Sequence, residues 1–380
     1  MTEVVVVGAG PVGLRVAMNT ANAGYDTVVL EKNAVIGKPV QCAGLVSPRV
    51  VELTDTESVI EKPKKAVINS PSGESLTIEA KSEKAVVIDR AKFDREMAAK
   101  AAKAGAEIRL KSAVKNTTYN GKREVEYLHQ GEKETLKADV VIGADGPTSI
   151  VRRTADLPSP EEVLPAVQAV VLSNDNTVQI HIGSKTAPGF FLYEVPFLTG
   201  KLIGLASDDG NTYQHLMDFL RSKNLDDNVI TFLSGTIPLG NLENTVRDGL
   251  CLVGDSACQI KPLSGGGIYL GIKAADICSE VVINALEEGD ISEKRLKEYH
   301  ERWELDIGKR ISRGMKVRKV FRNLSDEEID ELISILKKDK AKRVIEEEGD
   351  IDRHSALLKP LLKSAPELLK FTGPVIKSLF

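Results

Sequence analysis

The chain has 380 residues, with 51 Lys or Arg against 55 Asp or Glu and a formal net charge of −4. Its hydrophobic fraction of 42% is typical of globular proteins, and its length suffices for two closely packed domains. The net charge gives no basis for nucleic-acid binding.

The four cysteines, Cys42, Cys251, Cys258 and Cys278, are scattered and form no CxxC pair. This spacing argues against a zinc site and fits a reducing cytosol. The chain enters a strand pattern at Glu3 without a signal-peptide pattern, and no apolar run approaches the roughly 18 residues of a spanning helix. We therefore expect a cytoplasmic protein whose only membrane contact is peripheral, at the membrane surface.

The predicted elements alternate between strands and helices at both ends of a β-rich block. Buried parallel strands are predicted where short apolar runs occur, and helices where the apolar period is longer. In the N-terminal part we expect a strand at 4–7, a helix at 14–23, a strand at 27–30 and a loop at 33–49. Antiparallel strands within 65–88, a helix at 91–105 and a strand at 140–142 should follow, and then short strands with one helix at 165–245. The C-terminal part should hold a strand at 250–253, a helix at 267–286 and mainly helices after 300.

A glycine-rich turn joins the first strand to the first helix, with the sequence Gly8-Ala9-Gly10-Pro11-Val12-Gly13. In such a turn the first glycine permits a tight bend, the second lets a pyrophosphate approach the backbone, and the third lets the helix pack on the strand. Glu31 ends the second strand, followed by Lys32. Its carboxylate can bind ribose hydroxyls and would repel a 2′-phosphate, which favours FAD or NAD over NADP.

Two later strands also deliver Gly and Asp to the carboxyl edge of a sheet, where open α/β sheets bind ligands. One ends in Gly143-Ala144-Asp145-Gly146. The other ends in Gly254-Asp255, followed by Pro262 and by Gly265-Gly266-Gly267 at the start of a helix. Asp255 can accept a hydrogen bond from a ribityl or ribose hydroxyl, whereas an Asp-Gly pair such as Asp145-Gly146 is often an ordinary turn.

The order of these segments predicts an α/β protein with a Rossmann-type nucleotide-binding domain and an inserted sheet domain. We expect the nucleotide-binding domain to comprise residues 1–164 and 246–300. The antiparallel-sheet substrate domain would comprise 165–245, and a helical C-terminal region 301–380. A second GxGxxG after a strand does not occur, so a separate nicotinamide domain is not expected.

Together, the three segments resemble the aromatic-hydroxylase-like superfamily of FAD flavoproteins in order and spacing. The resemblance implies FAD as the cofactor. Asp89-Arg90, followed by Phe93-Asp94, resembles a superfamily segment whose arginine reaches FAD. By this resemblance Arg90 is a cofactor residue; read alone, it is a surface arginine at the start of a helix.

Two further segments resemble the geranylgeranyl reductase family within that superfamily. Lys38-Pro39-Val40-Gln41-Cys42-Ala43-Gly44-Leu45 is similar to the cysteine loop of the family, which implies that Cys42, Ala43 and Gly44 lie beside the flavin. The family motif PxxYxWxFP matches residues 188–196 at both prolines, but Phe191, Tyr193 and Val195 replace its Tyr, Trp and Phe. These departures leave the substrate less defined.

The resemblance implies an FAD-dependent reductase that saturates C=C bonds of prenyl chains, in archaea those of membrane ether lipids. Cys42 and Tyr193 are the candidate proton donors, although a buried cysteine that only packs is the simpler interpretation of Cys42 alone. Phe190, Phe191, Tyr193 and Phe197 are candidate channel residues, or ordinary core. The alternatives are an FAD monooxygenase or halogenase on the same scaffold, and a non-catalytic flavoprotein that relays electrons.

Two C-terminal features concern partners. Residues 294–323 hold 11 Lys or Arg and 4 Asp or Glu, which predicts docking of an acidic electron carrier such as ferredoxin; a solvated helical face and anionic lipid are the alternatives. Residues 357–380 carry an apolar series interrupted by prolines. We expect this series to cover the lipid entrance or to touch the membrane; the alternative is that it simply packs on the domain. The apolar residues are Leu357, Leu358, Leu361, Leu362, Leu368, Leu369, Phe371, Ile376 and Phe380.

Overall fold

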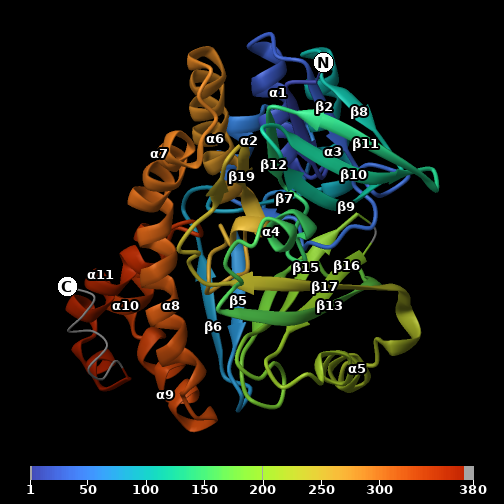
Figure 1. Cartoon of the computed structure of the whole chain (residues 1–380). Coiled ribbons are helices and arrows are strands. Elements are labelled where there is room, and N and C mark those ends of the chain that lie inside the picture. Colours follow the sequence, from blue (N-terminus) through green and yellow to red (C-terminus); the bar gives the residue numbers. More distant parts are fainter. Residues whose placement is uncertain (1, 199, 372–380) are drawn as a thin grey trace.

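The computed structural model describes residues 2–198 and 200–371, and within these ranges it consists of two large sheets flanked by a column of helices (Figure 1). Ile376 and Phe380 of the predicted apolar series lie outside the described residues. The α/β class predicted from the sequence, with a Rossmann-type domain, antiparallel sheets and C-terminal helices, is confirmed.

The first sheet holds six strands in the described part of the chain and is parallel except at one edge. Its spatial order is β18 (Val246–Arg247), β19 (Leu250–Leu252), β12 (Val140–Gly143), β1 (Val4–Val7), β2 (Thr27–Leu30) and β8 (Glu107–Arg109). Because β1, β12 and β19 are neighbours, the three ligand-binding segments predicted from the sequence end at the same edge of one sheet.

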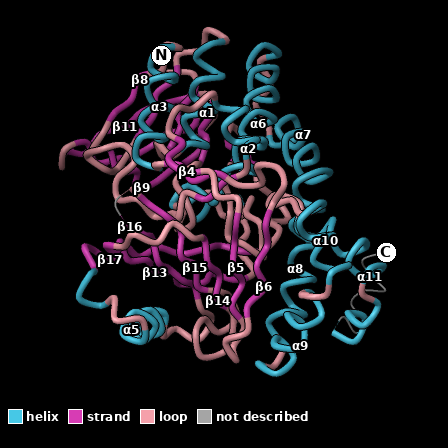
Figure 2. Tube along the Cα trace, turned by 180° about the vertical axis from the view of Figure 1, so that it is seen from behind, coloured by secondary structure: helices cyan, strands magenta, loops and turns pink. Residues whose placement is uncertain are grey.

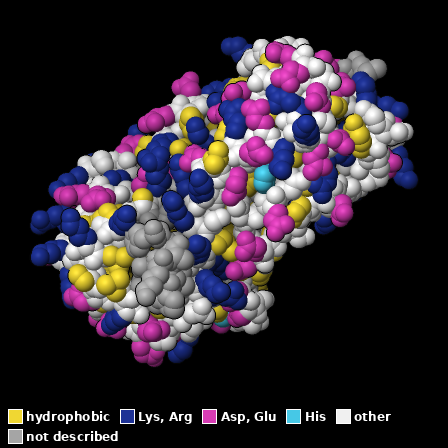
Figure 3. Space-filling model, turned by 60° about the vertical axis from the view of Figure 1, so that its left-hand side comes forward, with side chains coloured by type: hydrophobic (Ala, Val, Ile, Leu, Met, Phe, Trp, Pro, Cys, Tyr) yellow, Lys and Arg dark blue, Asp and Glu magenta, His cyan; other side chains and the backbone are white. Residues whose placement is uncertain are grey.

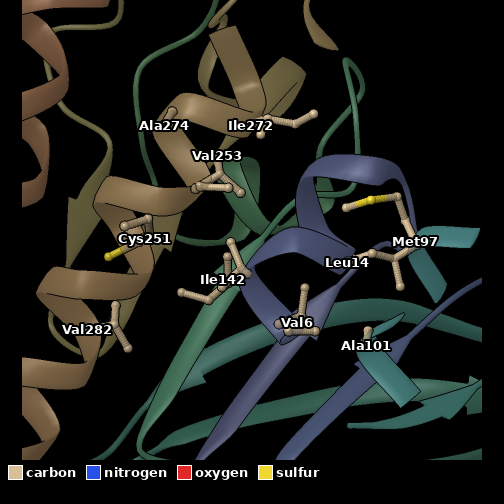
Figure 4. Packing of buried hydrophobic residues seen from close by; sticks show 14 of the residues in the cluster. Val6, Leu14, Met97, Ala101, Ile142, Cys251, Val253, Ile272, Ala274 and Val282 are labelled. Carbon is tan, nitrogen blue, oxygen red and sulfur yellow. The ribbon is translucent and has the colours of Figure 1, made fainter. Parts of the chain in front are cut away.

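Helices cover one face of this sheet and a β-meander covers the other. On the helical face, side chains such as Val6, Leu14 and Ile142 pack into a continuous core, which Figure 4 shows at close range. The helices are α1 (Pro11–Asn22), α3 (Arg90–Lys103) and α6 (Ile268–Glu288). The opposite face packs against β9 (Ser112–Tyr119), β10 (Arg123–His129), β11 (Glu132–Ala138) and α4 (Ile150–Thr154).

The second large sheet forms the other half of the molecule and is antiparallel apart from one pair. Its order is β17 (Val229–Leu239), β13 (Glu162–Leu172), β16 (Gly200–Ala206), β15 (Leu192–Phe197), β14 (Val178–His181), β5 (Lys65–Asn69) and β6 (Ser75–Glu79). Helix α5 (Thr212–Ser222) and the short turn η1 (Asp226–Asn228) follow β16, and α5 packs against β13 and β16.

This sheet extends beyond the residues 165–245 that the sequence pattern indicated. Strands β5 and β6 come from the N-terminal half of the chain and join it through a parallel pairing of β5 with β14. A small sheet, β3 (Leu45–Val46), β7 (Val86–Ile88) and β4 (Val59–Glu61), and helix α2 (Pro48–Thr54) link the two halves. The segment 33–49, predicted as a loop, therefore ends in a short strand and the start of α2.

The C-terminal helices run along one side of both halves, as Figures 1 and 2 show from opposite directions. Leu296, Tyr299 and Trp303 are fully buried on one helical face, and the Tyr299 hydroxyl donates to the Leu252 carbonyl oxygen at 2.7 Å. The elements are α7 (Glu293–Trp303), a π-turn (Glu304–Gly308), α8 (Lys309–Arg322), α9 (Asp326–Leu336), α10 (Asp339–Glu348), η4 (His354–Leu357), α11 (Leu358–Ser364) and η5 (Pro366–Phe371). The described helices include none long and apolar enough to cross a bilayer.

Candidate functional site

A cavity of about 1380 Å³ lies between the two sheets and reaches the C-terminal helices. It is larger than the roughly 300–1,000 Å³ of a pocket for one drug-sized ligand, so it has room for a dinucleotide and a second molecule. Many of the residues singled out from the sequence line it: Gly8, Gly10, Glu31, Lys32, Cys42, Ala43, Asp145, Gly146, Phe190, Phe191, Tyr193, Asp255, Gly265 and Gly266.

The glycine turn at the start of α1 has the geometry of a dinucleotide site. Gly8 has a φ of +104°, and a Cβ there would lie 2.4 Å from the Ala144 carbonyl oxygen. At Gly13 a Cβ would lie 2.2 Å from the Gly8 carbonyl oxygen, so α1 can approach β1 only with glycine. A Cβ at Gly10, by contrast, would meet nothing within 4 Å and would project into the cavity. Pro11 is the first residue of α1 and does not line the cavity.

Glu31 orients toward the glycine turn at the end of β2. Its carboxylate accepts hydrogen bonds at 2.8 Å from the backbone N–H groups of Ala9 and Asn33, and the residue is 8% exposed. These two bonds fix the carboxylate at the mouth of the turn. The carboxylate lines the cavity and has lone pairs left for ribose hydroxyls.

The two aspartates at the strand ends have different surroundings. Asp145 accepts hydrogen bonds from the Ser149 hydroxyl at 2.6 Å and from the N–H groups of Ile150 and Val151 at 2.7 and 3.1 Å, and therefore caps α4. Asp255 has no side-chain hydrogen bond within the described residues, although it lines the cavity. Burial raises the pKa of Asp255, and the positive charge of Arg90 offsets only part of this rise. Asp255 is half-buried, and a half-buried acceptor that lines a cavity without a protein partner is what a ligand hydroxyl would satisfy.

The glycines before α6 bring backbone close to Asp255. Gly265, with a φ of +66°, and Gly266 line the cavity, and a Cβ at Gly267 would lie 2.8 Å from Asp255 Oδ1. Gly267 and Gly254 do not line the cavity; Gly267 packs closely against Asp255, and Gly254 against Val12. Pro262, predicted as a cofactor residue, does not line this cavity and instead contacts α8.

The cysteine loop lies over the same cavity. The Cys42 Sγ accepts a hydrogen bond from the Gly44 N–H at 3.4 Å, and Gly44 has a φ of +72°, where a Cβ would collide with the Ile88 carbonyl oxygen. Arg90 lies behind the loop and is not a surface arginine. It pairs with Asp94 at 3.1 Å, and although burial alone would lower its pKa, Asp94 and the adjacent Cys42 raise it.

Tyr193 lines the same cavity as Cys42, and Gln168 connects it to the cysteine loop. The Tyr193 hydroxyl donates to Gln168 Oε1 at 2.7 Å, and Gln168 Nε2 donates to the Val40 carbonyl oxygen at 2.7 Å. Burial, together with the proximity of Cys42, raises the pKa of Tyr193. The hydroxyl therefore stays protonated. Gln168 was not predicted from the sequence, because a single glutamine in a strand belongs to no motif.

The aromatic residues of the predicted channel separate into two groups. Phe190 and Phe191 stack with ring centroids 4.5 Å apart and line the cavity. The Arg318 guanidinium lies 5.3 Å from the Phe190 ring centroid and donates to the Gly189 carbonyl oxygen, which anchors this segment to α8. Phe197 does not line the cavity, because the cavity ends before the end of β15.

The C-terminal region supplies a wall of the cavity through residues 350–351, which were not singled out from the sequence. Asp350 accepts from Arg49 Nη2 at 2.9 Å, and Asp352 accepts from Lys261 Nζ at 2.9 Å. These ion pairs tie residues 350–352 to α2 and to the loop before α6. Leu357 of the apolar series lines the cavity, whereas Leu361, Leu362, Leu368 and Phe371 pack around Ile335 and Ala341.

The residues present fit an FAD molecule. The cavity offers an open glycine at a helix N-terminus for the pyrophosphate, a fixed carboxylate for ribose and an unpartnered Asp255 for a sugar-chain hydroxyl. Within the described ranges no cluster of His, Cys, Asp or Glu side chains could hold a metal ion. When bound, FAD would supply hydride chemistry beside Cys42 and Tyr193.

Comparison with known proteins agrees with this geometry. Residues 1–187 match the family model described as FAD binding domain. The digeranylgeranylglycerophospholipid reductase of Methanocaldococcus jannaschii is 34% identical over 357 residues, covering 88% of this chain and 90% of that protein. Digeranylgeranylglycerophospholipid reductase 2 of Methanothermobacter thermautotrophicus is 30% identical, covering 98% of this chain and 99% of the relative.

Solved structures extend the similarity to the whole fold. A geranylgeranyl bacteriochlorophyll reductase-like protein from Thermoplasma acidophilum superposes with a TM-score of 0.87 at 26% identity, covering 98% of both chains. A flavin-dependent halogenase superposes with a TM-score of 0.71 at 16% identity, covering 97% of this chain and 78% of its own, and so shares the fold alone. The chain is an FAD-dependent oxidoreductase and belongs to the geranylgeranyl reductase family.

Proposed function

We propose that this protein reduces C=C bonds of geranylgeranyl chains in the synthesis of archaeal membrane ether lipids. The observation that carries the proposal is one continuous cavity that joins the dinucleotide-binding turn to an apolar and aromatic chamber. A prenyl chain is apolar throughout and would fill such a chamber. The names of the relatives, digeranylgeranylglycerophospholipid reductases from methanogens, support the same substrate class.

The chemistry requires a proton and a hydride on adjacent alkene carbons. An isolated alkene accepts hydride poorly, so protonation must generate cationic character that nearby aromatic faces and a dry site stabilise. The stacked Phe190 and Phe191 provide such faces. Because the Tyr193 hydroxyl donates its hydrogen bond to Gln168, we assign the proton transfer to the Cys42 thiol and the ordering of the cysteine loop to Tyr193 and Gln168.

The alternatives differ in their need for oxygen. A monooxygenase or halogenase would consume oxygen through an oxygenated flavin, whereas a reductase turns over without it. An electron-relay flavoprotein would reoxidise at a rate that prenyl compounds do not change. The halogenase comparison favours none of these, since likeness at 16% identity concerns the fold.

The deciding experiment is anaerobic incubation of the dithionite-reduced protein with a geranylgeranyl ether lipid. Mass spectrometry should show gains of about two mass units for each double bond saturated. The same incubation with heat-denatured protein is the control. An unchanged lipid mass, together with flavin that reoxidises only in air, would contradict the proposal.

The partner predictions concern a surface whose charge is partly neutralised in the folded chain. Several arginines of residues 294–323 are paired with carboxylates outside that segment, among them Arg302 with Glu280 at 2.7 Å and Arg322 with Asp208 at 2.6 Å. Lys294 and Lys297 are exposed, so α7 keeps a positive face. Leu369 is 54% exposed and is the described member of the apolar series that best suits peripheral membrane contact. Ferredoxin docking and membrane contact stay predictions.

A further inference from the structure

A second, smaller cavity of about 420 Å³ lies between α8 and the segment that carries η4 and α11. Arg310, Arg313 and Gly314 are three and four residues apart and line it from one face of α8. Helix α8 approaches the loop before α6 closely, since a Cβ at Gly314 would lie 2.9 Å from Pro262 Cδ. The wall of this cavity is therefore a fixed part of the fold.

The lining of the smaller cavity is strongly basic. Five Lys and Arg side chains and one carboxylate, Asp352, line it. Lys261 pairs with Asp352, which also pairs with Arg49, and Arg310 pairs with Asp306 outside the cavity. The guanidinium groups of Arg313 and Arg353 are exposed, and in the described part of the chain neither forms an ion pair or a side-chain hydrogen bond. The basic residues are Lys261, Arg310, Arg313, Arg353 and Lys359. Figure 3 shows Lys and Arg side chains gathered on the face that carries the C-terminal helices.

The smaller cavity adjoins the large one. Lys261, Leu263 and His354 line both cavities, while Leu357 faces the large cavity and its neighbour Leu358 the small one. Burial, with a contribution from Lys261, lowers the pKa of His354 to about 4. The imidazole is therefore neutral near pH 7. The three shared residues therefore lie between the basic lining of the smaller cavity and the apolar lining of the large one.

We propose that the smaller cavity binds the phosphate group of a prenyl lipid whose hydrocarbon chain extends into the large cavity. This inference rests on the proposed function. A guanidinium group can donate two parallel N–H hydrogen bonds to a phosphate, and the exposed guanidinium groups of Arg313 and Arg353 are available for such bonds at this cavity. A lipid with an anionic head group and an apolar chain would place the head group in the basic smaller cavity and the chain in the apolar large cavity.

The test compares two double variants of the FAD-loaded, full-length protein. Arg313→Ser/Arg353→Ser removes the two unpaired cations. Lys319→Ser/Lys340→Ser removes two exposed cations that line neither cavity and is the matched control. Each variant is assayed for FAD content and for reduction of a phosphate-bearing prenyl ether lipid and of its neutral glyceryl ether.

We expect the KM for the phosphate-bearing lipid to rise about tenfold or more in Arg313→Ser/Arg353→Ser, with the neutral ether unaffected and the control variant equal to wild type. The difference between the two lipids should also shrink as salt is raised. Equal changes for both lipids, or no change for either, would overturn the proposal.

Equilibrium binding without turnover distinguishes failure of the site from failure of the function. If the wild-type protein reduces neither lipid but binds the phosphate-bearing one more tightly through Arg313 and Arg353, the phosphate site stands and the reductase function fails. Inorganic phosphate serves as the third probe. If the double variant loses inorganic phosphate binding but keeps its lipid KM, the site takes free phosphate and the head-group assignment is wrong.

Discussion

Replacement of Gly10 by valine should abolish tight FAD binding without harming the fold. Gly10 has a φ of −75° and a ψ of 169°, an extended conformation open to any residue, and a Cβ there would meet nothing within 4 Å. The apoprotein should therefore be as stable as wild type, or gain up to about 1 kcal/mol because the unfolded chain loses freedom.

The cost to FAD follows from the contacts that the new side chain would block. A valine projecting from the N-terminus of α1 would displace the pyrophosphate from at least two backbone N–H groups, and hydrogen bonds to charged groups contribute about 1.5–3 kcal/mol each. The FAD dissociation constant should rise roughly 10²- to 10⁴-fold. Flavin fluorescence titration of the apoprotein measures this, and thermal unfolding without FAD measures the stability.

Gly235→Val is the matched control, since Gly235 lies in β17 and lines the same cavity but belongs to no dinucleotide-binding segment; its nearest neighbour would be the Gln41 side chain, 3.9 Å from the new Cβ. It should bind FAD as tightly as wild type. Wild-type FAD affinity in Gly10→Val would show that the pyrophosphate lies elsewhere. A large loss of apoprotein stability would show instead that Gly10 is needed for folding.

Three further predictions concern the proton donor, the unpartnered carboxylate and the electron carrier. Cys42→Ser and Cys42→Ala should retain FAD and dithionite reduction but lose most prenyl reduction by mass spectrometry; saturation at wild-type rates in both would exclude Cys42 as the acid. Burial raises the pKa of Asp255, so its charge destabilises the apoprotein above that raised pKa. Asp255→Asn should therefore stabilise the apoprotein at neutral pH, and this gain should disappear as the pH falls below the unfolded-state pKa of about 3.9. The same variant should weaken FAD binding about 10- to 150-fold. An apoprotein stability equal to that of wild type at pH 7 would contradict the burial argument. Lys294→Glu/Lys297→Glu should slow reduction by an acidic ferredoxin and reduce its dependence on salt; stopped-flow rates that match wild type at low salt would rule out docking on α7.

The sequence predicted the parts of the fold whose signals are local. The strand, glycine turn and helix over 4–22 can be read from adjacent residues, because glycine is needed at Gly8 and Gly13 for steric reasons that operate within one βαβ unit. The pairing of β5 with β14 could not be predicted in this way. It joins strands more than a hundred residues apart in the sequence. The alternation of apolar and polar residues in a half-buried strand is the same in either sheet, so it does not indicate which sheet the strand joins.

The ion pairs that hold the C-terminal wall of the cavity were missed for a related reason. Arg49, Asp350 and Asp352 are ordinary charged residues in sequence, and they become a cluster only when the last helices fold back over α2. Two of the predicted site residues lie outside the cavity lining for the same reason. Phe197 lies past the cavity edge, and Pro262 faces α8, although both stand in motifs whose other members line the cavity.

The two aspartates show where sequence patterns stop distinguishing structure from function. Asp145 and Asp255 both follow a buried strand and a glycine, and the sheet brings both to the same cavity. Asp145 is satisfied by three donors of its own chain, so a ligand would have to compete for it. Asp255 has no such donors among the described residues, and its partial burial raises its pKa. Its charge therefore costs stability in the empty protein, a cost that a bound hydroxyl donor would remove, and we propose Asp255 rather than Asp145 as the carboxylate that binds the cofactor.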